Sequence, residues 1–202
     1  MIFLDLDGVI AEFMYAACDV HDKPHDWPKY NHYESWGMTR DEFWRPINMM
    51  GTGFYMDVVK PAPWAERLIA TCRKADPELV VLTDSTDNMP GVYGKHLWIE
   101  RMFGVGTKVS YTREKHLLAA PGRLLIDDNP QNCEAFAMFG GSALLFPRPW
   151  NAGYPNCQGS YMTVIHKVAK WKHLRTVSNI ATADILESIE TCPSLPKTLA
   201  SV

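Results

Sequence analysis

Three short apolar runs in this sequence each end in polar or acidic residues. Residues 2–4 (IFL) precede Asp-Leu-Asp-Gly, residues 79–82 (LVVL) precede Thr-Asp-Ser, and residues 124–126 (LLI) precede Asp-Asp-Asn-Pro. Continuous apolar runs of this length are typical of strands that are buried on both faces of a parallel sheet. Ligands of such proteins bind beyond the carboxyl ends of the strands. The sequence therefore predicts an α/β fold with its active site at that edge.

Helical patterns alternate with these runs. Residues 62–74 and 94–103 carry apolar side chains at helical spacing, and residues 108–111 and 142–146 are predicted as further short strands. This alternation favours a right-handed α/β sandwich with helices flanking the sheet. We also expect a closing amphipathic helix at residues 178–190.

Residues 15–60 break the alternation. They are rich in aromatic residues, His, Asp and Pro, and they contain no run of the buried-strand kind. We interpret them as a mostly helical insertion after the first strand, in which Thr39 and Glu42 resemble a helix-capping box. The expected organisation is a core domain of residues 1–14 and 61–202 with a small subdomain of residues 15–60.

Composition and charge narrow the classes of function. The chain has 202 residues, 47% of them hydrophobic, which is enough for one buried core. Its formal net charge of -3 gives no basic field, so we expect a small-molecule substrate and neither a nucleic-acid polymer nor a membrane as partner. With no membrane-length apolar run, no signal-peptide pattern and five cysteines without a CxxC motif, we expect a cytoplasmic protein with reduced thiols.

The segment Asp5-Leu6-Asp7-Gly8 places two carboxylates where the first predicted strand ends. One carboxylate can attack phosphorus while the other protonates the leaving alkoxide, and the glycine allows a tight turn. The alternative is a strand followed by an acidic turn. The position directly after an apolar strand favours the catalytic interpretation.

Three further residues are candidates for contact with a phosphate. Thr83 supplies a hydroxyl and a backbone amide at the end of the second run. Lys115 could neutralise charge on a phosphoryl group during its transfer. Lys95 is the competing lysine, and we place it on the helix after Thr83, further from the chemistry. Each residue also has an interpretation without a catalytic role: Thr83 as a threonine that ends a strand, and each lysine as a solvated surface residue.

Asp127 and Asp128 follow the third run, so that with Asp5 and Asp7 up to four carboxylates converge on one edge. Like charges this close raise one another's pKa sharply unless a cation is present. Hard oxygen ligands and a phosphate substrate point to Mg²⁺.

A second group of possible metal ligands lies in the insertion. His21, His25 and His32 occur near several aspartates. Their irregular spacing and turn-rich context favour a solvated loop over a transition-metal site.

The segments DLDGVIAEF, VVLTD, REK and LLIDDNP resemble, in this order, the four motifs of the haloacid dehalogenase (HAD) superfamily. Within it the chain is similar to the 5'(3')-deoxyribonucleotidases, including bacterial and phage relatives, over roughly residues 1–150. Phe13, residues 53–57, Gly94-Lys95 and Trp98-Ile99 add to the match. The resemblance implies a Rossmann-like HAD core whose parallel sheet is flanked by helices, with a small helical cap inserted after the first strand.

The resemblance also implies a function, a Mg²⁺-dependent phosphomonoesterase that acts on (deoxy)nucleoside monophosphates through an aspartyl phosphate. Asp5 then serves as the nucleophile and a metal ligand, and Asp7 as the acid and base with its main-chain carbonyl on the metal. Thr83 and Lys115 would contact phosphate.

Two acidic positions stay open. The family has Mg²⁺ on one of the two aspartates after the third strand; we favour Asp128 as the direct ligand, with Asp127 a water-mediated or indirect partner. The family usually continues the second motif with Ser-Pro, whereas this chain has Asp84-Ser85. A carboxylate there would repel a phosphate dianion unless it points away or pairs with a cation.

Aromatic residues of the cap are expected to bind the base, since stacking on a ring contributes about 1 to 3 kcal/mol without demanding one base. Phe13 is our first choice. The candidates are Phe13, Trp36, Phe43, Trp44, Phe54 and Tyr55.

Two rival functions share the fold. One is a HAD phosphatase for a non-nucleotide such as a sugar phosphate, which would keep every core residue. The other is a non-catalytic binding protein with the HAD fold. The presence of all the expected catalytic residues, Asp5, Asp7, Lys115 and Asp128, argues against it. The oligomeric state is open, a homodimer being one option.

Overall fold

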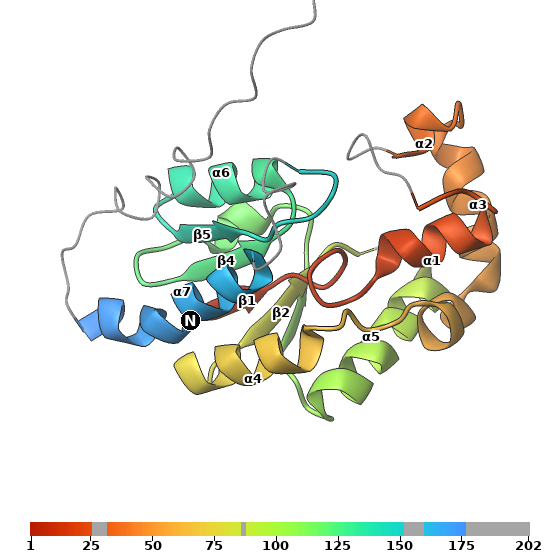
Figure 1. Ribbon diagram of the computed structural model, residues 1–202. Helices are drawn as coiled ribbons and strands as arrows, with labels where there is room; N and C mark the ends of the chain where they lie inside the picture. The colour runs from red at the N-terminus through yellow and green to blue at the C-terminus, as the bar shows by residue number, and fades with distance from the viewer. Residues whose placement is uncertain (26–31, 86–87, 152–159, 177–202) are drawn as a thin grey trace, which may run out of the picture.

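The computed structural model describes residues 1–25, 32–85, 88–151 and 160–176 (Figure 1). Its centre is a sheet of five parallel strands in the order β3-β2-β1-β4-β5. The strands are β1 (Ile2–Leu4), β2 (Val80–Thr83), β3 (Val109–Tyr111), β4 (Leu124–Asp127) and β5 (Ser142–Leu145). This sheet confirms the predicted α/β class and each predicted strand.

The three apolar runs form the three central strands. β1 lies between β2 and β4, with Phe3 paired to Val80 on one side and to Leu125 on the other. All three strands are buried along their whole length. Because they run parallel in neighbouring positions, the polar residues that follow them meet at one edge of the sheet.

Helices cover both faces of the sheet (Figure 1). On one face α4 (Ala65–Ala75), α5 (Met89–Phe103) and α7 (Ser160–Thr176) share a core with Ile2 and Leu4. On the other face α6 (Pro130–Met138) packs Phe136 against Phe3. The short 3-10 helix η2 (Lys115–Leu118) lies beside α6. Alternate residues of β1 thus point to opposite cores, as the pleat requires.

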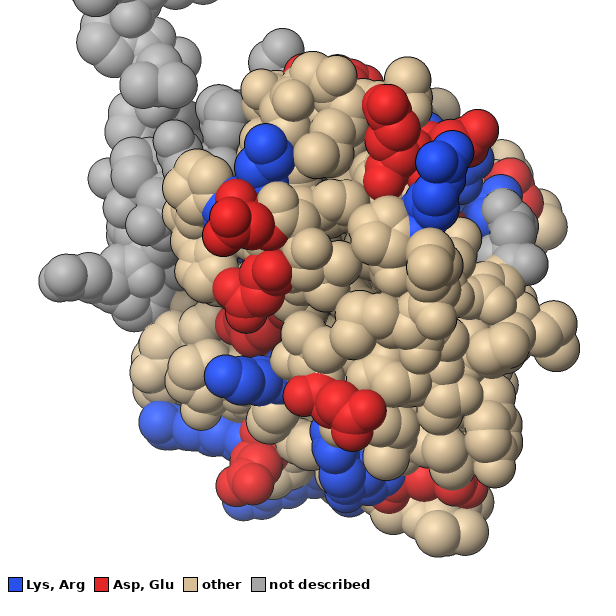
Figure 2. All heavy atoms as spheres, turned by 90° about the vertical axis from the view of Figure 1, so that its right-hand side faces the viewer, with Lys and Arg blue, Asp and Glu red and all other residues tan. Residues whose placement is uncertain are grey.

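The helices between β1 and α4 lie beyond the sheet, at the right in Figure 1. They are α1 (Phe13–Val20), α2 (His32–Ser35), α3 (Arg40–Met50) and the π-helix η1 (Phe54–Val58). The predicted capping box begins α3, where Thr39 Oγ1 accepts from the Glu42 amide and the Glu42 carboxylate accepts from the Thr39 amide. Figure 2 shows this side of the molecule, where basic and acidic side chains are interspersed among uncharged ones.

Some helix bounds differ from the prediction. The helix predicted at 62–74 is α4, and the one predicted to begin at residue 94 begins at Met89, because Pro90 in its first turn favours an earlier start. α7 was not predicted, although its buried residues Val164, Ile165, Val168 and Trp171 recur at helical spacing. The helix predicted at residues 178–190 lies outside the described residues. In the described part of the chain, no helix has the length and apolar character needed to cross a membrane.

Candidate active site

The segment after β1 begins the site. The Asp5 amide donates to the Ile126 carbonyl at 2.9 Å, which extends the pairing with β4 by one residue and fixes Asp5 at the sheet edge. The chain then turns at Gly8, whose φ is +80°. A Cβ atom at Gly8 would lie 2.3 Å from Asp128 Oδ2, so only glycine allows this turn to pass so close to that carboxylate.

Lys115 joins two of the aspartates. Its Nζ lies 2.7 Å from Asp5 Oδ1 and 2.7 Å from Asp127 Oδ2, and all three side chains are buried. Burial alone would lower the pKa of Lys115, but the charges of Asp5 and Asp127 outweigh it and raise the pKa. A permanently charged ammonium therefore lies beside Asp5.

The two neighbouring aspartates after β4 have different surroundings. Asp127 is fully buried and accepts hydrogen bonds from Lys115, from the Asn132 side chain and from the Asn129 amide. Asp128 instead lines the cavity and accepts a hydrogen bond from Trp150 Nε1 at 2.6 Å. The protein thus surrounds the Asp127 carboxylate, while Asp128 faces the space where a ligand would lie.

Three carboxylates are close enough to share a cation. Oxygens of Asp5, Asp127 and Asp128 lie within 4.8 Å of one another. Burial and the charge of Asp127 raise the pKa of Asp5 well above its usual range and that of Asp128 to about 7. Such a buried, all-oxygen cluster suits a hard divalent cation, and its chemistry fits Mg²⁺.

The position of Lys95 corrects a prediction. Lys95 is on α5, as expected, but its Nζ lies 2.8 Å from Asp7 Oδ2 and 3.2 Å from Thr83 Oγ1, at the centre of the site. Side chains on a helix lean toward its N-terminus, and the N-terminus of α5 follows β2 at the active edge. The long Lys95 side chain therefore reaches back to the strand ends.

Tyr55 also contacts Asp7. Its hydroxyl lies 3.0 Å from each carboxylate oxygen of Asp7. The sequence marks Tyr55 only as a base-stacking candidate, and nothing in its local pattern shows that its hydroxyl reaches the sheet edge. Trp150 was likewise missed, because it comes from the loop after β5.

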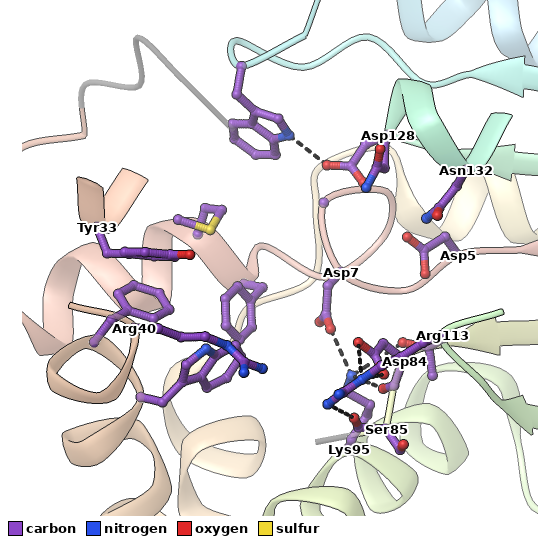
Figure 3. A pocket seen from close by; sticks show the side chains of 18 of the residues that line it. Asp5, Asp7, Tyr33, Arg40, Asp84, Ser85, Lys95, Arg113, Asp128 and Asn132 are labelled. Carbon is purple, nitrogen blue, oxygen red and sulfur yellow. Dashed lines mark hydrogen bonds and ion pairs between the residues drawn. The ribbon is translucent and has the colours of Figure 1, made fainter. Parts of the chain in front are cut away.

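Asp84 has a cationic partner. Arg113 Nε lies 3.1 Å and 3.2 Å from the two carboxylate oxygens of Asp84, and both side chains line the cavity (Figure 3). The pairing offsets the extra negative charge that the sequence places after Thr83. Both side chains are about half exposed, so water screens this ion pair.

A cavity of about 510 Å³ lies between the sheet edge and the helices after β1. In Figure 3, Asp5, Asp7 and Asp128 are on one side, and Tyr33 and Arg40 project from the other. Of the predicted aromatics, Phe13, Phe43, Trp44 and Tyr55 line the cavity. Trp36 and Phe54 do not line it; the Phe54 ring packs against Phe13 with centroids 5.4 Å apart.

The histidines of the insertion make other contacts. His21 Nε2 is 2.9 Å from the Phe43 carbonyl, and His25 Nε2 is 2.9 Å from Asp19. Within the described ranges neither belongs to a group of possible metal ligands. The side chain of His32 lies outside the described residues.

Solved structures share this architecture. A HAD hydrolase of family IA, variant 3, from Entamoeba histolytica has a TM-score of 0.50 and 10% sequence identity, covering 85% of this chain and 98% of its own. A haloacid dehalogenase-like hydrolase from Xanthomonas campestris has a TM-score of 0.50 and 12% identity, covering 86% and 93%. At these identities the likeness shows the fold alone. The sequence matches no curated protein.

The fold, with paired aspartates after its first strand and a lysine and acidic cluster at the same edge, defines a phosphatase of the HAD type. The sequence identifies the family more closely. Residues 1–177 match the family described as "5' nucleotidase, deoxy (Pyrimidine), cytosolic type C protein", and the chain belongs to this family. The match extends past the roughly 150 residues of the resemblance seen in the sequence and includes α7.

Proposed function

We propose that this protein hydrolyses (deoxy)nucleoside monophosphates in a Mg²⁺-dependent reaction through an aspartyl phosphate. The observation that carries the proposal is one cavity with Asp5, Asp7 and two buried lysines on one wall and aromatic side chains on the other. The first wall suits a phosphate and the second a nucleobase. The matching family is described as cytosolic, which supports a cytoplasmic location.

In the first step, a carboxylate oxygen of Asp5 attacks phosphorus as the bond from phosphorus to the nucleoside oxygen breaks. The electron pair of that bond stays on the nucleoside oxygen, which takes a proton from the Asp7 carboxylic acid. In the second step, Asp7 takes a proton from water as the water oxygen attacks phosphorus. The bond between Asp5 and phosphorus breaks, and inorganic phosphate leaves.

The remaining groups bind the phosphate and offset its negative charge. Lys115, held by Asp127, lies beside Asp5 and offsets charge on the phosphoryl oxygens. Thr83, which lines the cavity, is the proposed hydroxyl contact of the phosphate. Asp5, Asp128 and the main-chain carbonyl of Asp7 would hold Mg²⁺, which when bound acts as a Lewis acid on a phosphoryl oxygen.

The proposed base site is the aromatic wall. Phe13 lines the cavity and its ring lies 5.6 Å from that of Trp44, so the two rings offer adjacent apolar surfaces to a flat base. We propose residues 15–60 as the cap subdomain and residues 1–14 and 61–202 as the core. Closure of such a cap would exclude water from the reacting groups.

The test is phosphate release from deoxy- and ribonucleoside monophosphates and sugar phosphates, with Mg²⁺ or with EDTA. Asp5→Asn should abolish release without changing the melting temperature by more than a few degrees. Asp57→Asn, at an exposed aspartate outside the cavity, is the matched control and should be active.

Mg²⁺-dependent release from nucleotides, lost in Asp5→Asn, would support the whole proposal. Release from sugar phosphates alone would replace the substrate class and keep the chemistry. An active Asp5→Asn variant would contradict the assigned nucleophile, and a wild-type protein without activity on any ester would favour a binding function.

A further inference from the structure

The hydroxyl of Tyr55 is buried against the proposed acid and base. Only 1% of Tyr55 is exposed, and its hydroxyl donates to the Asp7 carboxylate. The Tyr55 ring is perpendicular to that of Phe54, and Lys95 Nζ lies 5.4 Å from its centre. The ring is thus part of the wall of the site, and its polar end is directed at Asp7.

A π-helix brings Tyr55 to this position. η1 contains Tyr55, and π-helical turns often occur at functional sites. Its end is anchored by a hydrogen bond of 3.0 Å from Trp98 Nε1 to the Val59 carbonyl. At its start, Gly94 of α5 lies so close to Thr52 that a Cβ atom would be 2.6 Å from the Thr52 carbonyl oxygen. η1 and α5 therefore pack as one unit.

Asp7 is held by both parts of this unit. Lys95, from α5, donates to Oδ2 at 2.8 Å, while Tyr55, from η1, lies 3.0 Å from both oxygens. The Asp7 side chain is 26% exposed and lines the cavity, so without these donors it would be free to adopt other rotamers. Because the two donors are rigidly connected, they restrict the Asp7 side chain to one rotamer.

We propose that Tyr55 is a positioning residue that, together with Lys95, holds the Asp7 carboxyl in the orientation in which it gives its proton to the leaving oxygen. The inference rests on the proposed role of Asp7 and goes beyond it. It replaces the expected base-stacking role of Tyr55 with a role in the chemistry of the leaving group.

The leaving group provides the test. An alkoxide needs a proton as it departs, whereas p-nitrophenolate is a stable anion that does not. kcat/KM reports the transfer of phosphate to Asp5, before the second step that all esters share. Because general acids contribute about 10² to 10⁴-fold, Tyr55→Phe should lower kcat/KM for a nucleoside monophosphate roughly 10-fold or more, and for p-nitrophenyl phosphate by less than about 3-fold.

Two controls separate positioning from general damage. Tyr93→Phe makes the same chemical change at an exposed hydroxyl on α5 and should leave both esters unaffected. In an Asp7→Ala background, adding Tyr55→Phe should cause no further loss with p-nitrophenyl phosphate, because the group that Tyr55 positions is already absent. Tyr55→Leu provides a second variant if Tyr55→Phe fails to fold.

An equal loss for both esters in a folded Tyr55→Phe protein would show a structural role and overturn the inference. No loss for either ester, or a further loss in the Asp7→Ala background, would overturn it as well. Failure of the proposed function is seen separately, in the wild-type protein alone, as an absence of phosphate release from every ester.

Discussion

Gly8 is the residue of the site with the least freedom to change. It combines a left-handed backbone with the closest approach to Asp128. The backbone conformation alone would favour glycine, but the approach to Asp128 links this turn to the proposed metal ligand. A substitution at Gly8 should therefore affect both the turn and the position of the Asp128 carboxylate.

Gly8→Ala should lower the free energy of unfolding by more than about 1 kcal/mol and weaken Mg²⁺ binding roughly 10-fold, because the new methyl group displaces Asp128. Gly140→Ala is the matched control, since Gly140 has a φ of +87° and open space around its Cβ position. Thermal unfolding with a Mg²⁺ titration measures both. Equal effects of the two substitutions would contradict the argument from proximity.

Apart from Lys115 and Phe13, the site residues predicted from the sequence are those at strand ends. Asp5, Thr83 and Asp128 follow apolar runs, and the pattern of those runs shows where the edge of a parallel sheet lies. Lys95 and Tyr55 could not be placed in the same way. They come from helical segments, and local spacing does not show how far a side chain reaches once the helix packs on the sheet.

Among the elements, the loop after β5 has the widest influence on the site. Trp150 donates to Asp128 Oδ2, and Asn151 Nδ2 donates to the carbonyls of Asp128 and Phe146. The guanidinium of Arg148 lies 4.6 Å from the Trp150 ring and is paired with Glu12 at the start of α1. The loop thus connects the carboxylate after β4 to the first helix of the chain.

Trp150→Phe should weaken Mg²⁺ binding about 10-fold while keeping the ring in place, because a hydrogen-bond partner of a ligand typically contributes about 10 to 100-fold to metal affinity. Isothermal titration with Mg²⁺ measures this directly. Trp171→Phe is the control, since the Trp171 indole N–H is buried and has no partner among the described residues. Unchanged Mg²⁺ affinity in Trp150→Phe would show that the hydrogen bond does not orient Asp128.

The strands were predicted more accurately than the helices. Buried strands are short and uniformly apolar, so β1, β2 and β4 could be located to within a residue or two. α5 carries exposed apolar residues such as Met89 and Tyr93 in its first turns, which obscure where its pattern begins. α7 was missed altogether, although its buried face of Val164, Ile165, Val168 and Trp171 recurs at helical spacing and packs against α4.

At the scale of the whole molecule, the acidic cluster makes stability depend on pH and on metal. An unfolded aspartate has a pKa near 3.9, whereas Asp128 in the folded protein has a pKa of about 7, and that of Asp5 is raised too. The folded state therefore holds these protons more tightly than the unfolded state. The resulting stabilisation is present below about pH 4 and is lost as the pH rises toward 7.

Without metal, the free energy of unfolding should fall between about pH 5 and pH 8, as the carboxyl groups of Asp5 and Asp128 lose their protons. Mg²⁺ should restore it most at the higher pH, where the ion does not have to displace a proton. The measurement is the melting temperature with EDTA and with Mg²⁺ across this range. Asp128→Asn, which cannot ionise, should show less of the metal-free decline. If Mg²⁺ raised the melting temperature more at about pH 5 than at about pH 8, the predicted direction of the pH dependence would be wrong.

The central place of β1 has a consequence for how the chain folds. β1 pairs with residues near 80 and near 125, so the middle of the sheet cannot form until the segment that contains β4 has been synthesised. Pairings so distant in sequence slow folding, since a long loop must close before each contact forms. Until β4 arrives, one side of β1 is an unpaired apolar edge, which is the stage at which the nascent chain would most need protection from aggregation.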